Sequence, residues 1–375
     1  MKHTDPFPER QLRTLYTAAL LSPILRLIPG SAAVGGGRAA WLGPLVAIPL
    51  LLLYAWLLSH LRRGMRPGET LAPLCLRVFG ARLGRLALLL LGAWLLFYTG
   101  FVLRAGAERF VVTIFPHSAQ SFFVLSMGLL GLLAALGSLQ SLVRVARIVA
   151  PILFFVLLAI LLVAFGKIDK SELLPLSLPD GPALLGSAWP SLDILSFGLA
   201  VPCFFHLGQA TAEHNGFRIS ALWLGGMVLF LTALGAAVQG RFGAALCVRL
   251  STPFFALVRN LVFFRSLERL EALVVGLWLF PDFLLAGMVL HAAQTCLRLA
   301  VGKSPQPGEK RLDLQNGRWI IWLCGAAAAI IGLFIAPSPA ALRRLSTQIV
   351  PLCSLAVAFG FLPLLYGVGK RKKLL

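Results

Sequence analysis

The sequence is poor in acidic residues and in charge as a whole. Only 14 of its 375 residues are aspartate or glutamate, against 34 lysines and arginines, and charged residues make up 13% of the chain. Soluble globular domains carry about 25% charged residues, so this composition excludes that class. The basic residues punctuate apolar runs and form no basic domain with interleaved aromatics. This pattern argues against a nucleic-acid partner, despite a net charge of +20.

The residue patterns that catalysis or metal binding needs are also missing. The six cysteines are scattered and form no CxxC pair, which excludes a disulfide framework or a zinc site: Cys75, Cys203, Cys247, Cys296, Cys324 and Cys353. The sequence has no HExxH and no GxSxG, and "VGKS" at 301–304 has Leu297 where a phosphate-binding loop needs glycine. The sequence therefore predicts no enzyme, no cofactor and no metal.

What the chain has is long apolar runs. Hydrophobic residues make up 58% of it, and its mean hydropathy is +0.87. About twenty apolar residues in a helix span a bilayer. Ten such runs predict an all-α integral membrane protein, one polytopic domain over 1–375: 11–34, 40–61, 84–106, 120–138, 144–166, 189–211, 218–239, 267–297, 318–336 and 346–368. Two amphipathic segments, 71–86 and 252–267, are expected at the membrane surface.

Lysine and arginine predict the orientation. With the N-terminus inside, 21 of the 34 fall on cytoplasmic segments and 12 on outer ones, and Arg26 lies within the first span. This bias predicts that both termini are cytoplasmic, with 369–375 as a basic cytoplasmic tail.

The first and sixth spans contain helix-breaking residues. The first reads "ALLSPILRLIPG", with Pro23 and the pair Pro29-Gly30, and the sixth contains Gly198 and Pro202. The ten spans divide into halves of five, about 11–166 and 189–368, and an interrupted span opens each half. Matching interruptions are typical of inverted-repeat transporters, which bind ligands at the breaks. We therefore expect a leucine-transporter-like 5+5 inverted repeat with helices 1 and 6 broken. The alternative is a pair of proline kinks that bind nothing.

This fold predicts a ligand site around the breaks and along the third span. The candidates are Ser22, Pro23, Ile24, Arg26, Tyr98, Phe101, Gly198, Leu199 and Ala200. Arg26 either pairs with a substrate carboxylate or an internal acid, or extends its charged end to the interface.

Three further residues are candidates for ion or proton coupling: Asp193, His206 and Asp282. Each has a structural alternative, namely a solvated boundary position for Asp193, a carbonyl contact for His206 and a water-exposed kink for Asp282. Arg104, Glu108 and Arg109 close the third span, where Arg104 and Glu108 are expected to form a surface ion pair.

Several motifs, taken in order, resemble the spore germination permease family, the B-subunits of endospore germinant receptors. The first is "IPGSAAVGGGRAAWL", with Pro29, Trp41 and Leu42 in the family's Leu-x-Pro and Trp-Leu positions. The second is "RPGETLAPLCLRVFGARLGRL", in which Pro67, Gly68, Thr70, Leu71, Gly80 and Gly84 match, and Arg147 matches at the entrance of the fifth span. The third is "STPFFALVRNLVFFRSLERLEALVVGLW", with matches at Pro253, Arg259, Glu268, Arg269, Leu270, Glu271 and Trp278.

The resemblance implies the amino acid–polyamine–organocation superfamily and a receptor for small germinants, such as amino acids. It also implies two partners in the inner spore membrane, an A-subunit membrane protein and a C-subunit lipoprotein. One departure is Ser22-Pro23-Ile24 where the family has Gly-x-Gly, which predicts a ligand other than alanine, or weak or lost binding. Two alternatives stay open: a stand-alone ion-coupled amino acid permease in the inner spore or cell membrane, and an interaction protein with a decayed pocket.

Overall fold

The chain is described by a computed structural model, and helices account for the regular secondary structure of the residues that it describes. The described residues are 9–66, 69–174, 180–205, 216–250, 252–261, 274, 276–302 and 314–374. In the first half lie α1 (Glu9–Gly36), η1 (Gly37–Leu42), α2 (Gly43–Val46), α3 (Ile48–Arg63), α4 (Leu71–Thr113), α5 (Gln120–Leu136), α6 (Leu139–Phe165) and η2 (Lys170–Glu172). In the second half lie α7 (Asp180–Phe204), α9 (Gly216–Arg249), α10 (Pro253–Asn260), α12 (Leu279–Ala300), α13 (Leu314–Phe334), α14 (Pro339–Arg344), η4 (Leu345–Ile349), α15 (Val350–Leu355), η5 (Ala356–Phe361) and α16 (Leu362–Arg371).

Long apolar helices confirm a multi-pass membrane protein. Within the described ranges, seven helical stretches are long and apolar enough to cross a membrane, and the first of them, Arg10–Arg63, contains two of the predicted spans. Two shorter apolar helices, Gln120–Leu136 and Trp319–Phe334, coincide with the predicted fourth and ninth spans. Large apolar side chains such as Leu229 and Phe334 are more than two-thirds exposed, as expected of a surface that faces lipid.

Helices α1 and α7 are continuous, so the predicted breaks are absent from the described residues. Helical structure runs from Glu9 to Gly36 through Pro23 and Pro29, and from Asp180 to Phe204 through Gly198 and Pro202. Proline removes one backbone donor, and in a membrane helix neighbouring groups can satisfy the freed carbonyl. The prolines therefore interrupt single hydrogen bonds here and do not end the helices.

The chain bends instead at two glycines with positive φ. Gly80 has φ +79° and ψ 177°, and Gly243 has φ +70° and ψ 161°. Only glycine adopts this backbone region without strain. Gly80 therefore separates the amphipathic segment that begins at Leu71 from the spanning part of α4, while Gly243 separates the spanning part of α9 from its last turn.

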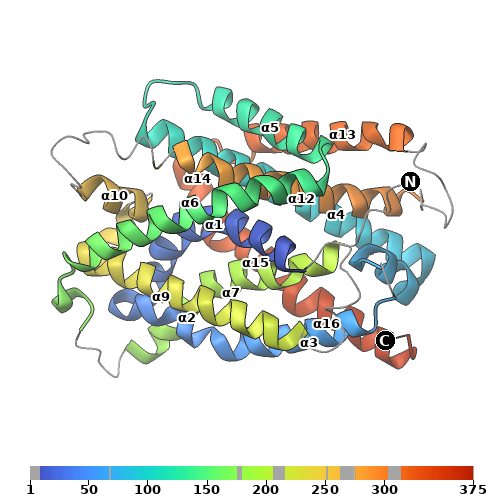
Figure 1. The fold of residues 1–375 in the computed structure, drawn as a ribbon, viewed down its shortest axis with the longest axis horizontal. Coiled ribbons are helices and arrows are strands. Elements are labelled where there is room, and N and C mark those ends of the chain that lie inside the picture. The colour runs from blue at the N-terminus through green and yellow to red at the C-terminus, as the bar shows by residue number, and fades with distance from the viewer. Residues whose placement is uncertain are drawn as a thin grey trace.

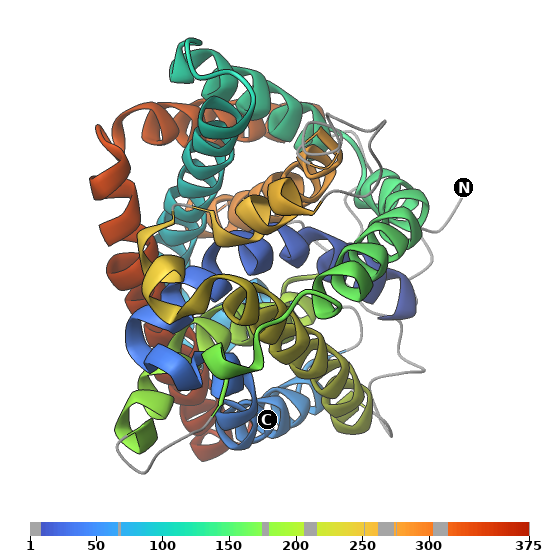
Figure 2. The same ribbon diagram turned by 90° about the vertical axis from the view of Figure 1, so that its left-hand side faces the viewer.

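Helix α1 lies in the middle of the bundle. It contacts α6, α7, α9 and α12, and α4 runs along α12 and α13 (Figures 1 and 2). Small residues bring α1 close to α7, because a Cβ on Gly35 would lie 2.6 Å from the backbone of Gly186. In the last span, η4 and η5 are π-helical turns within an otherwise α-helical rod. Helix α1, which belongs to the first half of the chain, therefore contacts helices of both halves.

Candidate functional site

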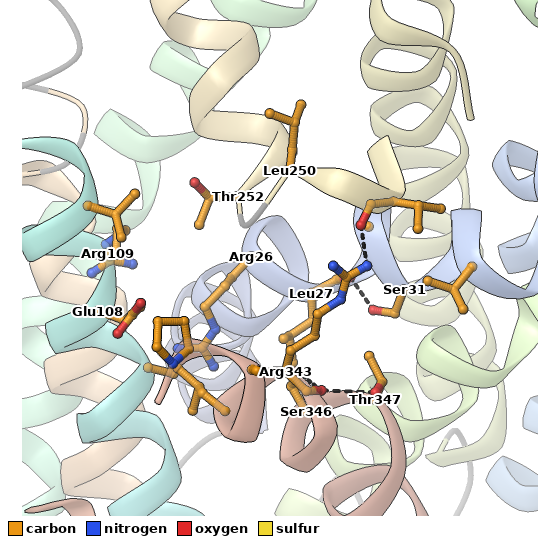
Figure 3. Close-up of a pocket in the computed structure, with 18 of the residues that line it drawn as sticks. Arg26, Leu27, Ser31, Glu108, Arg109, Leu250, Thr252, Arg343, Ser346 and Thr347 are labelled. Atoms are coloured by element: carbon orange, nitrogen blue, oxygen red, sulfur yellow. Dashed lines mark hydrogen bonds between the residues drawn. The ribbon is translucent and has the colours of Figure 1, made fainter. Parts of the chain in front are cut away.

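A cavity of about 280 Å³ lies at one end of the bundle. Its walls come from the last turns of α1, the end of α4, the segment from Val248 to Thr252, and the start of the last span (Figure 3). Four charged side chains line it: Arg26, Glu108, Arg109 and Arg343. A cavity of this size falls just below the range of about 300–1,000 Å³ that is typical of drug-sized ligands, so it suits a small molecule.

Arg26 is the unusual group of this cavity. Its side chain is only 6% exposed, and its guanidinium Nε, Nη1 and Nη2 atoms have no hydrogen-bond partner in the described part of the chain. The guanidinium lies over the ring of Phe101, 5.4 Å from its centroid. A buried guanidinium without a carboxylate partner is costly, especially at membrane depth, and this favours a functional role.

The acid that interacts with Arg26 already has other partners. Asp282 lies in the first turn of α12, is 1% exposed and interacts electrostatically with Arg26. Its Oδ2 accepts a hydrogen bond from Arg109, and its Oδ1 accepts one from the Ser22 hydroxyl. Both side chains of the Arg109–Asp282 ion pair are completely buried. This pair joins α4 to α12, and Ser22 adds α1, so Asp282 acts here as a structural partner of Arg109.

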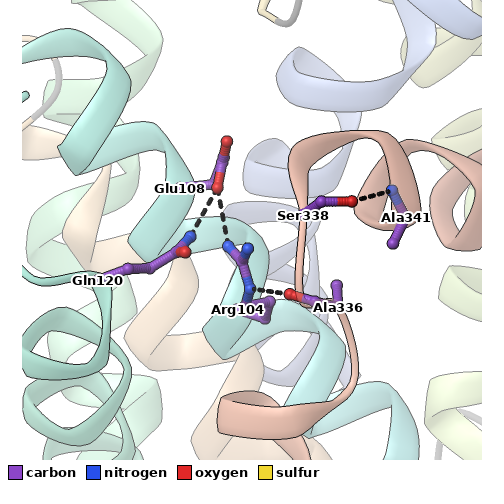
Figure 4. A network of polar contacts seen from close by, with 6 residues as sticks. All are labelled: Arg104, Glu108, Gln120, Ala336, Ser338 and Ala341. Carbon is purple, nitrogen blue, oxygen red and sulfur yellow. Dashed lines mark hydrogen bonds and ion pairs between the residues drawn. The ribbon is translucent and has the colours of Figure 1, made fainter.

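A second polar network fixes another wall of the cavity (Figure 4). Glu108 Oε2 accepts from Arg104 at 2.8 Å and from Gln120 at 2.6 Å. Arg104 Nε also donates to the carbonyl of Ala336 at 3.0 Å, just before Ser338 caps α14. The predicted Arg104–Glu108 pair is confirmed, but Arg104 is 3% exposed and not at the surface. The network joins α4, α5 and the entrance to the last span.

Asp193 lines a smaller cavity of about 140 Å³ beside the first one. The two cavities share five lining residues: Leu27, Ser31, Val34, Ser346 and Thr347. Asp193 is 4% exposed, and the hydroxyl of Ser354 in α15 lies within hydrogen-bonding reach of its carboxyl group. A buried acid thus lines a cavity that shares a wall with the Arg26 cavity.

Of the nine predicted ligand residues, Arg26 and Phe101 line the larger cavity. Gly198 lies in a filled region, where a Cβ would lie 2.6 Å from Leu20 and 2.7 Å from a ring carbon of Trp223. The other predicted positions are buried in the helix contacts: Ser22, Pro23, Ile24, Tyr98, Leu199 and Ala200. His206 lies outside the described residues. The role of these positions in ligand binding stays a prediction.

Sequence reasoning did not place Glu108, Arg109 or Arg343 in the cavity. A signal existed for Arg109, because an acid deep in an apolar run needs a cationic partner and Asp282 is such an acid. Arg343 follows Pro339 at the edge of a span, where basic residues are common, so no sequence pattern pointed to it.

Comparison with known proteins agrees with this architecture. A mutant of the manganese transporter from Eremococcus coleocola superposes with a TM-score of 0.59 and 15% identity, over 97% of this chain and 81% of the transporter. This likeness shows the fold, which is that of a leucine-transporter-like membrane protein. No curated protein matches the chain. The sequence profile described as "Spore germination protein" matches residues 11–312, about four-fifths of the chain, and the protein therefore belongs to the spore germination protein family.

Proposed function

We propose that this protein is the membrane subunit of a spore germinant receptor and that it binds a small germinant through a carboxylate. The family match supports the receptor role. The observation that carries the binding site is Arg26, a buried guanidinium that lines a cavity and has no hydrogen-bond partner in the described residues.

The chemistry of Arg26 favours an anionic group on the ligand. A guanidinium presents its donors in a planar fork that matches a carboxylate, and such charge-assisted pairs are about twice as strong as neutral hydrogen bonds. Leu27, Phe101 and Leu342 contribute apolar surface to the lining beside Arg26. An amino acid supplies the carboxylate in a molecule small enough for about 280 Å³.

The proposed membrane topology determines to which side of the membrane this cavity opens. If both termini are cytoplasmic, α1 and α4 end at the outer face, and α14 begins there. The cavity then opens away from the cytoplasm, where a germinant arrives. In the 5+5 inverted repeat that we propose, the first half includes α1 and α4 and the second includes α7, α9 and α14. A ligand on Arg26 therefore contacts both halves.

The receptor requires partners that transmit the signal. We infer that the chain assembles with an A-subunit, which is a membrane protein, and with a C-subunit lipoprotein. Their absence would leave binding intact but would prevent germination.

The alternative function is an independent ion-coupled permease for amino acids. The transporter-like fold favours it, and so does Asp193, a buried acid beside the Arg26 cavity that forms no ion pair in the described ranges. Asp282 and His206 remain further candidates for coupling in that alternative. A permease must carry out net flux, whereas a receptor subunit must only bind.

The test is ligand-induced thermal stabilisation of the detergent-purified protein with the twenty amino acids. A ligand at 100 times its Kd stabilises the folded state by about 2.7 kcal/mol. We expect at least one amino acid to stabilise the wild type and Arg344→Gln but not Arg26→Gln. Arg344 is the control because it is exposed on α14 and does not line the cavity. Uptake of that ligand into proteoliposomes without partners would instead support the permease.

A further inference from the structure

The charges around the Arg26 cavity do not balance. Its lining contains three arginines and one acid, namely Arg26, Arg109, Arg343 and Glu108. Arg109 is paired with Asp282 outside the lining, and Glu108 is paired with Arg104. Within the described residues, Arg26 and Arg343 are the lining cations that form no ion pair. The cavity therefore has an excess of two positive charges.

Arg343 differs from Arg26 in what it contacts. Its guanidinium Nη2 donates to the carbonyl of Val248, near the end of α9, so it reaches from α14 across to the other side of the cavity mouth (Figure 3). The carbonyl of Arg343 accepts from the hydroxyls of Ser346 at 2.8 Å and Thr347 at 2.9 Å. These contacts hold the backbone of Arg343 in place, whereas the acceptor of its charged end among the described residues is a neutral carbonyl.

We propose that the ligand of this cavity carries two carboxylates, one bound by Arg26 and the other by Arg343. This inference rests on the proposed function and narrows its ligand to small dicarboxylates and acidic amino acids. A carboxylate is a stronger acceptor than a peptide carbonyl, so it displaces Val248 from the guanidinium of Arg343. A dianion also neutralises both excess charges, of which that of Arg26 is buried and therefore costly, whereas Arg343 is exposed.

The exchange of acceptors links binding to the shape of the protein. Because the Arg343–Val248 bond connects α14 with the end of α9, its loss frees the start of the last span from that helix. Arg104 and Glu108 still join α4 to α5 and, through Ala336, to the chain just before α14. Ligand binding is thus expected to shift α14 relative to the end of α9.

The experiment compares acids with their amides. Isothermal titration measures the binding of glutamate, glutamine, aspartate, asparagine and succinate to the full-length protein. A second charge-assisted contact is worth about tenfold or more in affinity. We expect one of the acids to bind at least about tenfold more tightly than its amide, and Arg343→Gln to abolish that preference while the weaker binding persists. Arg26→Gln removes both, and Arg344→Gln changes neither.

Failure of this inference is distinguishable from failure of the proposed function. One outcome is that an amino acid with an uncharged side chain binds in an Arg26-dependent way, while acidic ligands bind no more tightly than it does to the wild type or to Arg343→Gln. In that case the second carboxylate is refuted and the receptor site stands. If nothing binds to the folded wild type, or if binding ignores Arg26→Gln, both proposals are refuted. The fold of each variant is checked by its thermal unfolding without ligand.

Discussion

Two arginines of one cavity should respond in opposite ways to the same substitution. Arg26 and Arg109 both line the cavity, but Arg109 has a carboxylate partner in Asp282 and Arg26 has no hydrogen-bond partner in the described residues. Methionine keeps much of the apolar stem and removes the charge. We expect Arg26→Met to stabilise the ligand-free protein and Arg109→Met to destabilise it.

The magnitudes follow from the environment of each guanidinium. An arginine near the centre of a membrane helix costs about 2.5–3.5 kcal/mol on insertion scales. The contact of Arg26 with the ring of Phe101 returns about 0.5–2 kcal/mol. Arg26→Met should therefore raise the free energy of unfolding by about 0.5–3 kcal/mol. Removing one partner of a buried ion pair costs about 3–5 kcal/mol, so Arg109→Met should lower it by that amount.

The assay is unfolding of both variants and the wild type in one detergent, by heat and by denaturant, with no ligand present. Each variant serves as the control for the other, because the same substitution is made in the same cavity. If Arg26→Met loses stability as Arg109→Met does, then Arg26 has a partner in the folded protein, and the argument for an open ligand-binding cation is refuted. A gain in stability together with lost binding would show that the site is maintained at the expense of stability.

Three other predictions follow from the same contacts. Asp282→Asn should lower the free energy of unfolding by about 3–5 kcal/mol. The double variant Arg109→Met, Asp282→Leu should recover most of this lost stability, as measured by a double-mutant cycle. If the losses of the two single variants add, the pairing is refuted. Gly198→Val should lower the free energy of unfolding by about 1–3 kcal/mol, because the site is already filled. Gly225→Val should lower it by less than about 1 kcal/mol in the same assay, because a Cβ there would meet open space. Equal effects of the two substitutions would contradict the filled α1–α7 contact. Gly80→Ala should cost about 1–3 kcal/mol through its positive φ, measured as thermal unfolding, and no loss would contradict the bend.

The bilayer explains why so much of the fold could be predicted from the sequence. Each spanning helix needs about twenty apolar residues, so the spans are visible as runs such as 144–166, which the structure confirms as α6 (Leu139–Phe165). Whether a spanning helix is continuous could not be predicted in this way. Whether Pro23 ends a helix depends on the helices that pack against α1, which are α6, α7, α9 and α12. The sequence therefore indicated a special position in α1 but predicted the wrong local structure.

The candidate site could be predicted in part, because charged residues are rare within apolar runs and therefore stand out in the sequence. Arg26 was a candidate for this reason, and the structure places it in a cavity. The pairing of Arg109 with Asp282 joins residues 173 positions apart, so only the tertiary arrangement reveals it. Arg343 is identified by its place at the cavity and not by its sequence context.

The π-helical turns of the last span have a consequence for how this cavity is encoded. A π-turn holds one residue more than an α-turn, and each residue advances an α-helix by about 100°. Deleting one residue within η4 (Leu345–Ile349) would leave an ordinary helix but would rotate Arg343 by about 100° relative to Ser354 and the rest of the span. The direction in which the arginine points is thus set by the number of residues in one turn. Deletion of Gln348, which does not line the cavity, would turn the second cation away from it although every lining residue is still in the sequence.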